Sequence, residues 1–280
     1  MREIPVSRVT EAVRGLCIEA NRRLPPDIER CILQRREEES WPPACGILDS
    51  ILENISLARE KGLPLCQDTG MACIFLEIGQ EIHFTGGGLY DAVQDGVRQG
   101  YREGLLRASV VRDPLRRENT RDNTPAVIDC QLVPGDKVQI TLAPKGFGSE
   151  NMSRLQMLKP SDGLEGVKRF VLETVRLAGP NPCPPIVVGV GLGGTFDRVA
   201  LLAKKALLRP LDNPNPDPFY QALEEELLSL INETGIGPQG FGGRTTALGV
   251  QIEAFPTHIA GLPAAVNINC HVTRHAHAEI

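Results

Sequence analysis

Aromatic side chains and long apolar runs are both scarce in this chain of 280 residues. Phe, Tyr and Trp make up only 4% of it, too few for a surface that stacks nucleic-acid bases. Acidic residues outnumber basic ones, 35 to 30, and the net charge of −5 also disfavours nucleic acid as a partner. No apolar run approaches the roughly 20 residues that span a bilayer, and residues 1–10 contain no apolar leader. We therefore expect a cytoplasmic protein with no nucleic-acid or membrane partner.

Cysteine, glycine and proline are better represented. Eight cysteines in a cytoplasmic protein are expected to be reduced, which makes them candidates for metal binding or catalysis. The 28 glycines and 22 prolines gather in loops, many of them beside cysteines or charged residues. Stiff, glycine-rich loops on a packed scaffold are where binding sites are usually built.

Hydrophobic periodicity predicts a mixture of helices and strands. Apolar residues at steps of three and four indicate an N-terminal helical part, about 1–62, and later helices over 89–103, 163–178, 196–208 and 219–233. Predicted strands cover 72–78, 126–133, 137–143, 185–190, 246–253 and 264–269, with a hairpin turn at 134–136. Because helices and strands do not alternate strictly, we expect an α+β fold. The predicted architecture is a single domain, 1–280, with N-terminal helices packed on a mixed sheet and long glycine-rich loops.

A glycine pattern in the second half of the chain has two interpretations. Gly189 to Gly194 matches GxGxxG between a predicted strand and a predicted helix, the setting of a dinucleotide-binding turn. The acidic residue expected about 20 residues further on would be Asp212, which lies in a proline-rich segment with no strand before it. The pattern therefore favours a helix N-terminus that faces an anion or a cofactor over a nicotinamide site.

Cysteine and histidine residues also suggest more than one chemistry. The C-terminal run from Cys270 to His277 could be taken for a zinc site, but it lacks the spacing of known zinc motifs. A nucleophilic Cys66 or Cys270 with His258 as its base is a second possibility, without a local signature.

Three of the eight cysteines share an unusual setting. Cys66, Cys183 and Cys270 each lie in a polar or proline-stiffened loop at the end of a predicted element. The others fall in or beside predicted helices and strands, where a small buried apolar side chain is the ordinary interpretation. The three positions are too far apart for a single-loop ferredoxin pattern. A metal cluster held by three separate loops would be consistent with this arrangement.

Several longer motifs resemble one enzyme family. The segments PLCQDTG, KGFGSEN, MLKPSDG, AGPNPCPP, GVGLGGT, AKKALLRPL, GIGPQGFGG and THIAGLPAAVNINCH, between about 45 and 275, are similar to the N-terminal half of class I fumarases. They are also similar to the alpha subunits of two-chain fumarases and tartrate dehydratases. These enzymes are iron–sulfur hydro-lyases. The resemblance implies a [4Fe–4S] cluster bound by Cys66, Cys183 and Cys270, whose fourth iron is open to act as a Lewis acid.

The resemblance also implies roles for residues around the cluster. Asp68 and His258 match catalytic positions of the family. Gln67, Arg107 and Gly148 match positions that bind the dicarboxylate substrate, the arginine through its guanidinium and the glycine through its backbone N–H. Gly146 is an alternative to Gly148. No role is implied for Lys145, Lys159 or Arg244.

A second catalytic domain of single-chain fumarases has no counterpart in the sequence. The resemblance therefore implies an alpha subunit that needs a beta subunit, in an α2β2 assembly, for activity. Fumarate and malate are the expected substrates, with tartrate or methylfumarate as alternatives. An interpretation from another class is a non-catalytic iron–sulfur scaffold or redox sensor.

Overall fold

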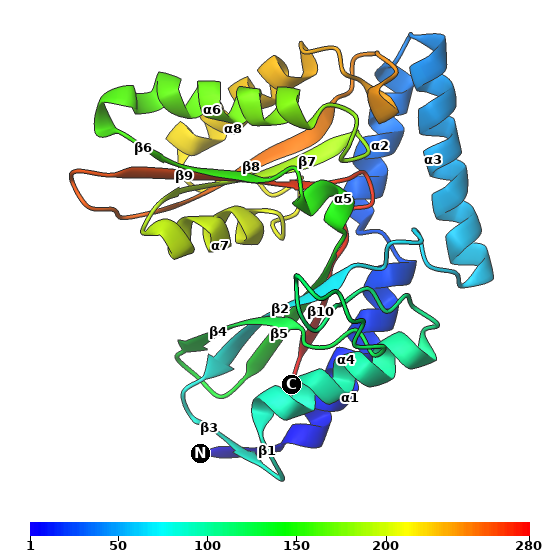
Figure 1. Ribbon diagram of the computed structural model, residues 1–280, viewed down its shortest axis with the longest axis vertical. Helices are drawn as coiled ribbons and strands as arrows, with labels where there is room; N and C mark the ends of the chain where they lie inside the picture. Colours follow the sequence, from blue (N-terminus) through cyan, green and yellow to red (C-terminus); the bar gives the residue numbers. More distant parts are fainter. The chain divides into compact units, whose positions relative to one another are not determined.

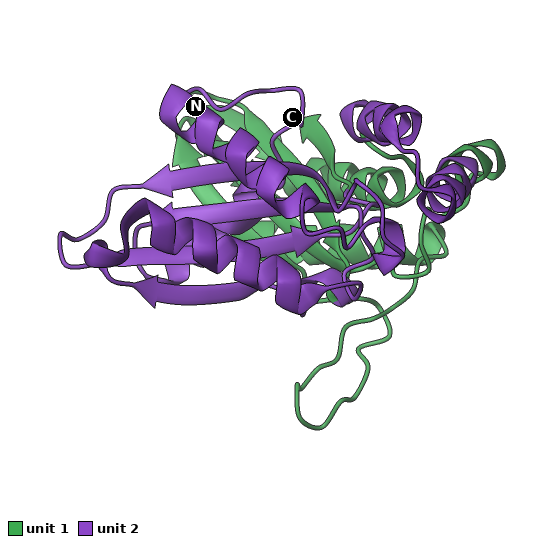
Figure 2. Ribbon diagram, turned by 90° about the horizontal axis from the view of Figure 1, so that it is seen from above, with its two compact units in different colours: residues 1–25, 55–147, 274–280 green, residues 26–54, 148–273 purple.

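The computed structural model describes all residues, 1–280. By its internal contacts the chain divides into two compact units, which are shown in different colours in Figure 2. Unit 1 comprises residues 1–25, 55–147 and 274–280, and unit 2 comprises residues 26–54 and 148–273. Both units combine helices with strands, which confirms the expected α+β class. No helix is long and apolar enough to cross a membrane.

Unit 1 packs two helices against a four-stranded sheet (Figure 1). The helices are α1 (Val6–Arg22) and α4 (Leu89–Glu103). The sheet has the order β10 (Ala276–Glu279), β5 (Val138–Lys145), β2 (Met71–Gly79), β4 (Val127–Val133). A second, two-stranded sheet pairs β1 (Arg2–Pro5) with β3 (Ile82–Thr85). The core lies between α1, α4 and the larger sheet, where the side chains of β2 and β5 are buried.

The prediction of a hairpin turn at 134–136 is wrong. Strands β4 and β5 form, but they do not pair with each other: β2 lies between them, parallel to β4 and antiparallel to β5. Seven of the nine residues of β2 are buried. A strand so apolar is most stable at a central position of a sheet, with neighbours on both sides.

Unit 2 is a three-layer arrangement (Figure 1). Its sheet has the order β6 (Arg154–Leu158), β9 (Leu262–Asn269), β7 (Ile186–Gly193), β8 (Ala247–Phe255). Helices α6 (Gly163–Ala178) and α8 (Pro218–Asn232) pack on one face, and α7 (Phe196–Ala206) packs on the other. Helix α2 (Pro26–Glu38) and the first part of α3 (Pro42–Lys61) complete the unit. Short helices are α5 (Phe147–Glu150), η1 (Pro160–Asp162) and η2 (Pro238–Gly240).

The GxGxxG pattern is a packing feature of unit 2. Gly189 and Gly191 lie inside β7, not in a turn that opens a helix as expected. A Cβ on Gly191 would lie 2.2 Å from the carbonyl oxygen of Val199, and one on Gly189 would lie 2.2 Å from that of Ala203. Both contacts are with α7. The two glycines therefore let α7 approach the sheet closely, and the interpretation as a helix N-terminus facing an anion or cofactor is wrong for them.

Candidate functional site

The Cys66 loop of unit 1 connects the end of α3 to β2. The Cys66 side chain is half-buried, and its Sγ accepts a hydrogen bond from the backbone N–H of Asp68 at 3.4 Å. The same sulfur lies 3.6 Å from Oε1 of Gln67, whose side chain is exposed. The Cys66 sulfur is therefore held in place by its own loop, and a cysteine sulfur is a metal ligand as the thiolate.

Asp68 joins this loop to the segment that follows β5. Its Oδ1 accepts from the backbone N–H of Gly70 at 3.0 Å, and its Oδ2 accepts from that of Phe147 at 3.0 Å. A Cβ on Gly146 would lie 3.2 Å from Oδ2. The motifs PLCQDTG and KGFG, both singled out from the sequence, therefore meet at the Asp68 carboxylate.

Gly70 explains why the two segments can approach each other. Its φ of 71° is in the left-handed region, and a Cβ there would lie 2.7 Å from the backbone of Lys145. Met71 pairs with Lys145 at the end of the β2–β5 ladder. The strand pairing and the absence of a side chain at Gly70 together bring the Asp68 loop onto the Lys145–Phe147 segment.

Arg107 is tied to the same loop through its backbone. Its N–H donates to Oγ1 of Thr69 at 2.9 Å, and the Thr69 hydroxyl lies 3.2 Å from the Arg107 carbonyl oxygen. Thr69 is buried, whereas Arg107 is exposed. The structure thus brings Cys66, Gln67, Asp68 and Arg107 of the predicted site together in unit 1.

Cys183 lies in the proline-rich loop between α6 and β7 of unit 2. It has a φ of 56°, a left-handed conformation that is uncommon for any residue other than glycine, and its side chain is exposed. The carbonyl oxygen of the next residue, Pro184, accepts hydrogen bonds from the backbone N–H of Gln239 at 2.9 Å and from its side-chain amide at 2.7 Å. Strained backbone of this kind is retained mostly at functional positions.

Cys270 directly follows β9 in the same unit and lies next to the Cys183 loop. The following residue, His271, donates its backbone N–H to the carbonyl oxygen of Cys183 at 3.3 Å, and its Nδ1 lies 3.0 Å from that oxygen. The Asn269 amide donates to Oγ1 of Thr273 at 2.8 Å and closes the turn that contains Cys270. Two of the three predicted cluster ligands are therefore neighbours in unit 2, and Cys66 belongs to unit 1.

The remaining five cysteines lie within helices or strands. Burial raises the pKa of Cys17 to about 12, and burial is also the main cause of the raised pKa of Cys31. Cys73 is buried in β2, and the Cys45 thiol donates to the carbonyl oxygen of Glu39 at 3.4 Å.

The donor set fits an iron–sulfur cluster. Within neither unit do three histidine, cysteine or acidic side chains form a group that could hold a metal ion. The three cysteines in question are thiols outside any disulfide, each in a loop at the end of a strand or helix, and none of them is fully buried. Thiolates are the ligands that iron–sulfur clusters require.

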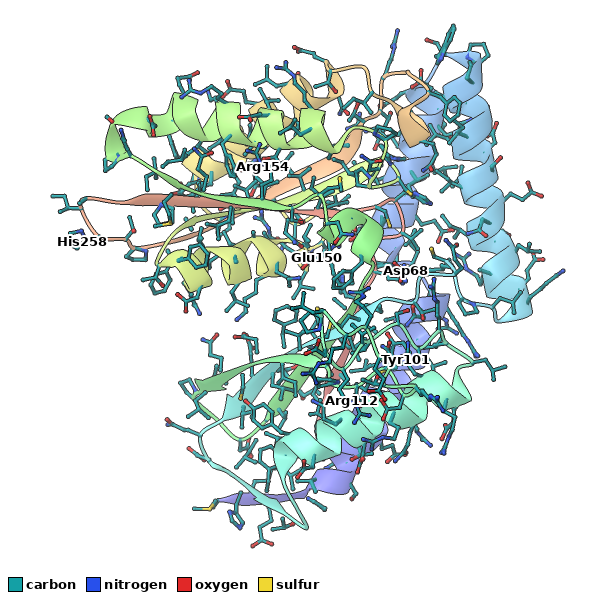
Figure 3. All side chains as sticks on the ribbon, viewed as in Figure 1. Asp68, Tyr101, Arg112, Glu150, Arg154 and His258 are labelled. Atoms are coloured by element: carbon teal, nitrogen blue, oxygen red, sulfur yellow. The ribbon has the colours of Figure 1, made fainter.

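His258 and Gly148 lie away from these groups. His258 is exposed in the loop that connects β8 to β9, where its Nδ1 accepts from the backbone N–H of Ala260 at 3.2 Å. Figure 3 shows it at the end of the unit 2 sheet remote from Glu150. The eight residues of β9, spanning about 26 Å, separate it from Cys270. Gly148 belongs to unit 2, and a Cβ on it would lie 3.8 Å from the carbonyl oxygen of Asn181, whereas Gly146 is beside Asp68.

Arg244 lies on a separate surface cleft of unit 2. The cleft, of about 720 Å³, is bordered by α2, α8 and the loop before β8, and its lining includes Arg35, Glu233 and Arg244. The backbone N–H of Arg244 donates to Oε2 of Glu39 at 2.7 Å. That carboxylate also accepts from the backbone N–H groups of Ser40 and Trp41, so it holds the Arg244 loop against the α2–α3 connection.

Some residues that support the site are absent from the sequence-based prediction. Asn21, Tyr101, Asn123 and Arg274 are buried and make hydrogen bonds to the Cys66 loop or to one another. Each comes from a different segment of the chain, and no spacing rule links them. His271, which contacts the Cys183 carbonyl oxygen, is adjacent to Cys270 in the sequence, and this neighbouring Cys–His pair is the only local signal for it.

Comparison with known proteins identifies the family. A family model described as Fumarate hydratase (Fumerase) matches residues 10–279. The chain belongs to this fumarate hydratase family. A protein of Methanocaldococcus jannaschii named "Putative L(+)-tartrate dehydratase subunit alpha" is 43% identical over 275 residues, which cover 96% of each chain.

Two bacterial proteins are more distant relatives of this chain. L(+)-tartrate dehydratase subunit alpha of Escherichia coli O157:H7 is 31% identical over 277 residues, 95% of this chain and 88% of that protein. The protein of the same name from Escherichia coli strain K12 is 30% identical over 277 residues, again 95% of this chain and 88% of that protein. Family membership makes the chain a hydro-lyase, an enzyme that adds water to a carbon–carbon double bond or removes it.

Proposed function

We propose that the protein is the alpha subunit of a two-chain hydro-lyase that interconverts fumarate and malate. The family match over residues 10–279 carries this proposal. The relatives' names, which contain the words subunit alpha, support a beta subunit as partner. In the proposal the two chains assemble as α2β2, and the alpha chain alone turns over little or no substrate.

We infer that Cys66, Cys183 and Cys270 together bind a [4Fe–4S] cluster. When bound, such a cluster supplies an iron with an open coordination position, a Lewis acid suited to a hydroxyl and a carboxylate. Three thiolate ligands and no fourth are the number that leaves one iron open. The N–H donor to Cys66 and the contact between His271 and Cys183 support the assignment.

Asp68 is proposed to move the proton at the substrate carbon. That carbon is a weak acid, so the base must be held at a fixed place within hydrogen-bond distance of it. The hydrogen bonds from Gly70 and Phe147 hold the Asp68 carboxylate by both oxygens. Each carboxylate oxygen can accept more than one hydrogen bond, so these contacts leave the group able to accept a proton.

The other site residues are proposed to bind the dicarboxylate. Arg107 offers an exposed guanidinium that can pair with a carboxylate through two parallel N–H groups, and its backbone is fixed by Thr69. Gln67 is exposed beside Cys66. Gly148 is proposed to donate its backbone N–H, with Gly146 as the alternative, and His258 is proposed as a second catalytic group.

A second candidate substrate is L(+)-tartrate. The names of the relatives, including the one that is 43% identical, favour it. Tartrate dehydration is the same elimination of water next to a carboxylate, so the roles proposed for Asp68 and Arg107 serve either substrate.

Anaerobic reconstitution tests the cluster assignment. The chain is incubated with ferrous iron and sulfide, and bound iron and sulfide are measured for the wild type and for Cys66→Ala, Cys183→Ala and Cys270→Ala. The control is Cys130→Ala, because Cys130 is exposed like Cys183 but lies in β4. We expect each of the three variants, and not the control, to lose iron. Equal iron in all five proteins would contradict the assignment.

Activity of the reconstituted pair tests the reaction. The loaded alpha chain is mixed with a beta-type chain from the same source and assayed with malate, L(+)-tartrate and methylmalate. We expect activity only in the mixture and a preference for malate. A preference for tartrate would replace the substrate assignment, and a cluster whose spectrum ignores every dicarboxylate would indicate a scaffold or redox sensor.

A further inference from the structure

Three consecutive backbone carbonyls of the Cys66 loop are each held by a buried side chain. Nη2 of Arg274 donates to the Asp68 carbonyl oxygen at 2.7 Å. The Tyr101 hydroxyl lies 2.8 Å from the carbonyl oxygen of Thr69 and 3.0 Å from that of Gly70, and the Asn123 amide donates to the latter at 3.1 Å. The donors are between 0 and 4% exposed. Figure 3 labels Tyr101 and Asp68.

The donors are anchored in turn. Nη2 of Arg274 also contacts Oδ1 of Asn21 at 3.2 Å, and Asn21 donates its side-chain amide to the Cys17 carbonyl oxygen at 2.9 Å. The backbone oxygen of Asn21 accepts from the N–H of Leu65 at 2.8 Å, directly before Cys66. Asn21 is fully buried in the last turn of α1. One asparagine therefore fixes the start of the loop and the arginine that holds its middle.

The network also reaches Arg107. The Thr69 side chain hydrogen-bonds the Arg107 backbone, and the Tyr101 hydroxyl holds the Thr69 carbonyl. Oδ1 of Asn123 accepts from the backbone N–H of Ser109 at 2.7 Å, two residues after Arg107. All of these residues belong to unit 1. A shift of the network would therefore move the proposed metal ligand, the proposed base and the proposed carboxylate-binding residue together.

Arginine is almost never fully buried without a partner. Arg274 is 4% exposed, and its guanidinium donates to a backbone carbonyl and a side-chain amide oxygen in the interior. A guanidinium presents its donors in a rigid planar fork, so its N–H groups have a more fixed direction than those of a lysine ammonium on its flexible stem. Arg274 follows Cys270 by four residues in the sequence.

We propose that Arg274 is a positioning residue, which with Tyr101 and Asn123 holds the Cys66–Gly70 loop in the geometry needed for cluster and substrate binding. This inference rests on the proposed function for its catalytic meaning. The three side chains hold the loop in place whichever dicarboxylate is the substrate.

Hydrogen–deuterium exchange of the full chain without metal tests the positioning directly. We expect Arg274→Gln to speed exchange of the amides of residues 65–70 by about tenfold, as expected when a local opening loses one strong hydrogen bond. Arg274→Lys should lie between this variant and the wild type. The control is Arg209→Gln, which removes a half-buried arginine of unit 2 paired with Glu224. The control should lower the melting temperature but leave exchange of residues 65–70 unchanged.

Iron content after anaerobic reconstitution is the second measurement. We expect Arg274→Gln to retain less iron than the wild type and than Arg209→Gln at the same fraction folded. Wild-type exchange and wild-type iron content in Arg274→Gln would overturn the inference. If Arg274→Gln does not fold, Tyr101→Phe replaces it in both measurements, because it removes only the hydroxyl, and the same two results then decide. A wild-type chain that binds no iron would reject the proposed cluster, whereas the exchange data would still decide the positioning role.

Discussion

The carboxylate of Asp68 accepts a hydrogen bond from the backbone N–H of Phe147, 79 residues later in the sequence. Oδ2 of Asp68 makes this contact, and Oδ1 accepts from Gly70 within its own loop. One side chain therefore connects the loop that carries Cys66 to the glycine-rich segment after β5. The same contacts orient the carboxylate, so the structural and the proposed catalytic roles of Asp68 rest on the same two oxygens.

Asp68→Asn should separate the two roles. An amide keeps one acceptor but turns an NH₂ group toward one of the two N–H donors, and it cannot act as a base. We expect kcat of the reconstituted pair to fall by at least about 100-fold and the free energy of unfolding to fall by about 1–3 kcal/mol. Steady-state kinetics and urea unfolding measure the two effects.

The matched control for Asp68 is Asp113→Asn. Oδ1 of Asp113 also accepts backbone N–H bonds, from Leu115 and Arg116, but in an exposed loop outside the proposed site. It should leave kcat unchanged. A variant Asp68→Asn that keeps wild-type kcat would show that another group moves the proton.

The sequence predicts helices more accurately than strand pairing. The ranges predicted for α4 and α6 agree with the structure because an apolar stripe defines each helix and a glycine follows each one. The pairing of β2 between β4 and β5 is decided by burial of a strand distant in the sequence, which no local turn signal reports. The missed strands β1, β3, β6 and β10 have only four or five residues, too few to show a period.

The sequence likewise predicts some residues of the candidate site and not others. Cys66 and Asp68 are recognisable because they lie in a long motif, and Cys183 is recognisable from the prolines around it. Arg274 and Asn123 are not, because each one's partner is a backbone carbonyl far away in the sequence, which leaves no pattern of residue types. Local motifs thus identify the residues that we propose to bind a ligand, whereas the buried residues that hold them are found only in the structure.

Gly191→Ala tests the packing interpretation of the GxGxxG pattern. Its Cβ would lie 2.2 Å from the Val199 carbonyl oxygen and 2.7 Å from the Ala203 nitrogen, both backbone atoms of α7. We expect a loss of about 1–3 kcal/mol in the free energy of unfolding, the usual cost of overpacking. Gly15→Ala is the control, because Gly15 in α1 has open space around the new methyl group. It should stabilise the protein by about 0.5–1 kcal/mol. Equal urea midpoints for both variants would contradict the packing interpretation.

Cys17 should make the stability of the protein sensitive to alkaline pH. Burial raises its pKa to about 12 in the folded state, whereas an unfolded cysteine has a pKa of about 8.5. The stabilisation from the buried neutral thiol is therefore complete below about pH 8.5 and declines as the pH rises toward about 12. Above pH 8.5 the unfolded state binds fewer protons than the folded state, so the free energy of unfolding decreases by up to about 1.4 kcal/mol per pH unit.

Cys17→Ala should remove this pH dependence. Urea unfolding of both proteins between pH 7 and 10 measures the difference, and the other seven cysteines cancel because both proteins contain them. We expect the wild type to be the more stable protein at pH 7 and the gap to narrow as the pH rises. Parallel curves would show that Cys17 ionises as readily in the folded protein as in the unfolded one.

His258→Asn tests the most distant residue of the proposed site. The exposed imidazole lies at one end of β9 and Cys270 lies at the other, so His258 cannot reach a cluster bound at Cys270 of its own unit 2. If His258 is catalytic, it must therefore contribute to the active site of another chain in the assembly.

We expect His258→Asn to lower kcat of the reconstituted pair by at least about tenfold. The control is His83→Asn, an exposed histidine of β3, which should leave kcat unchanged. Mixing His258→Asn with Cys270→Ala chains should then restore part of the activity, because one site in the mixed assembly receives both intact residues. Full activity of His258→Asn alone would remove His258 from the catalytic site.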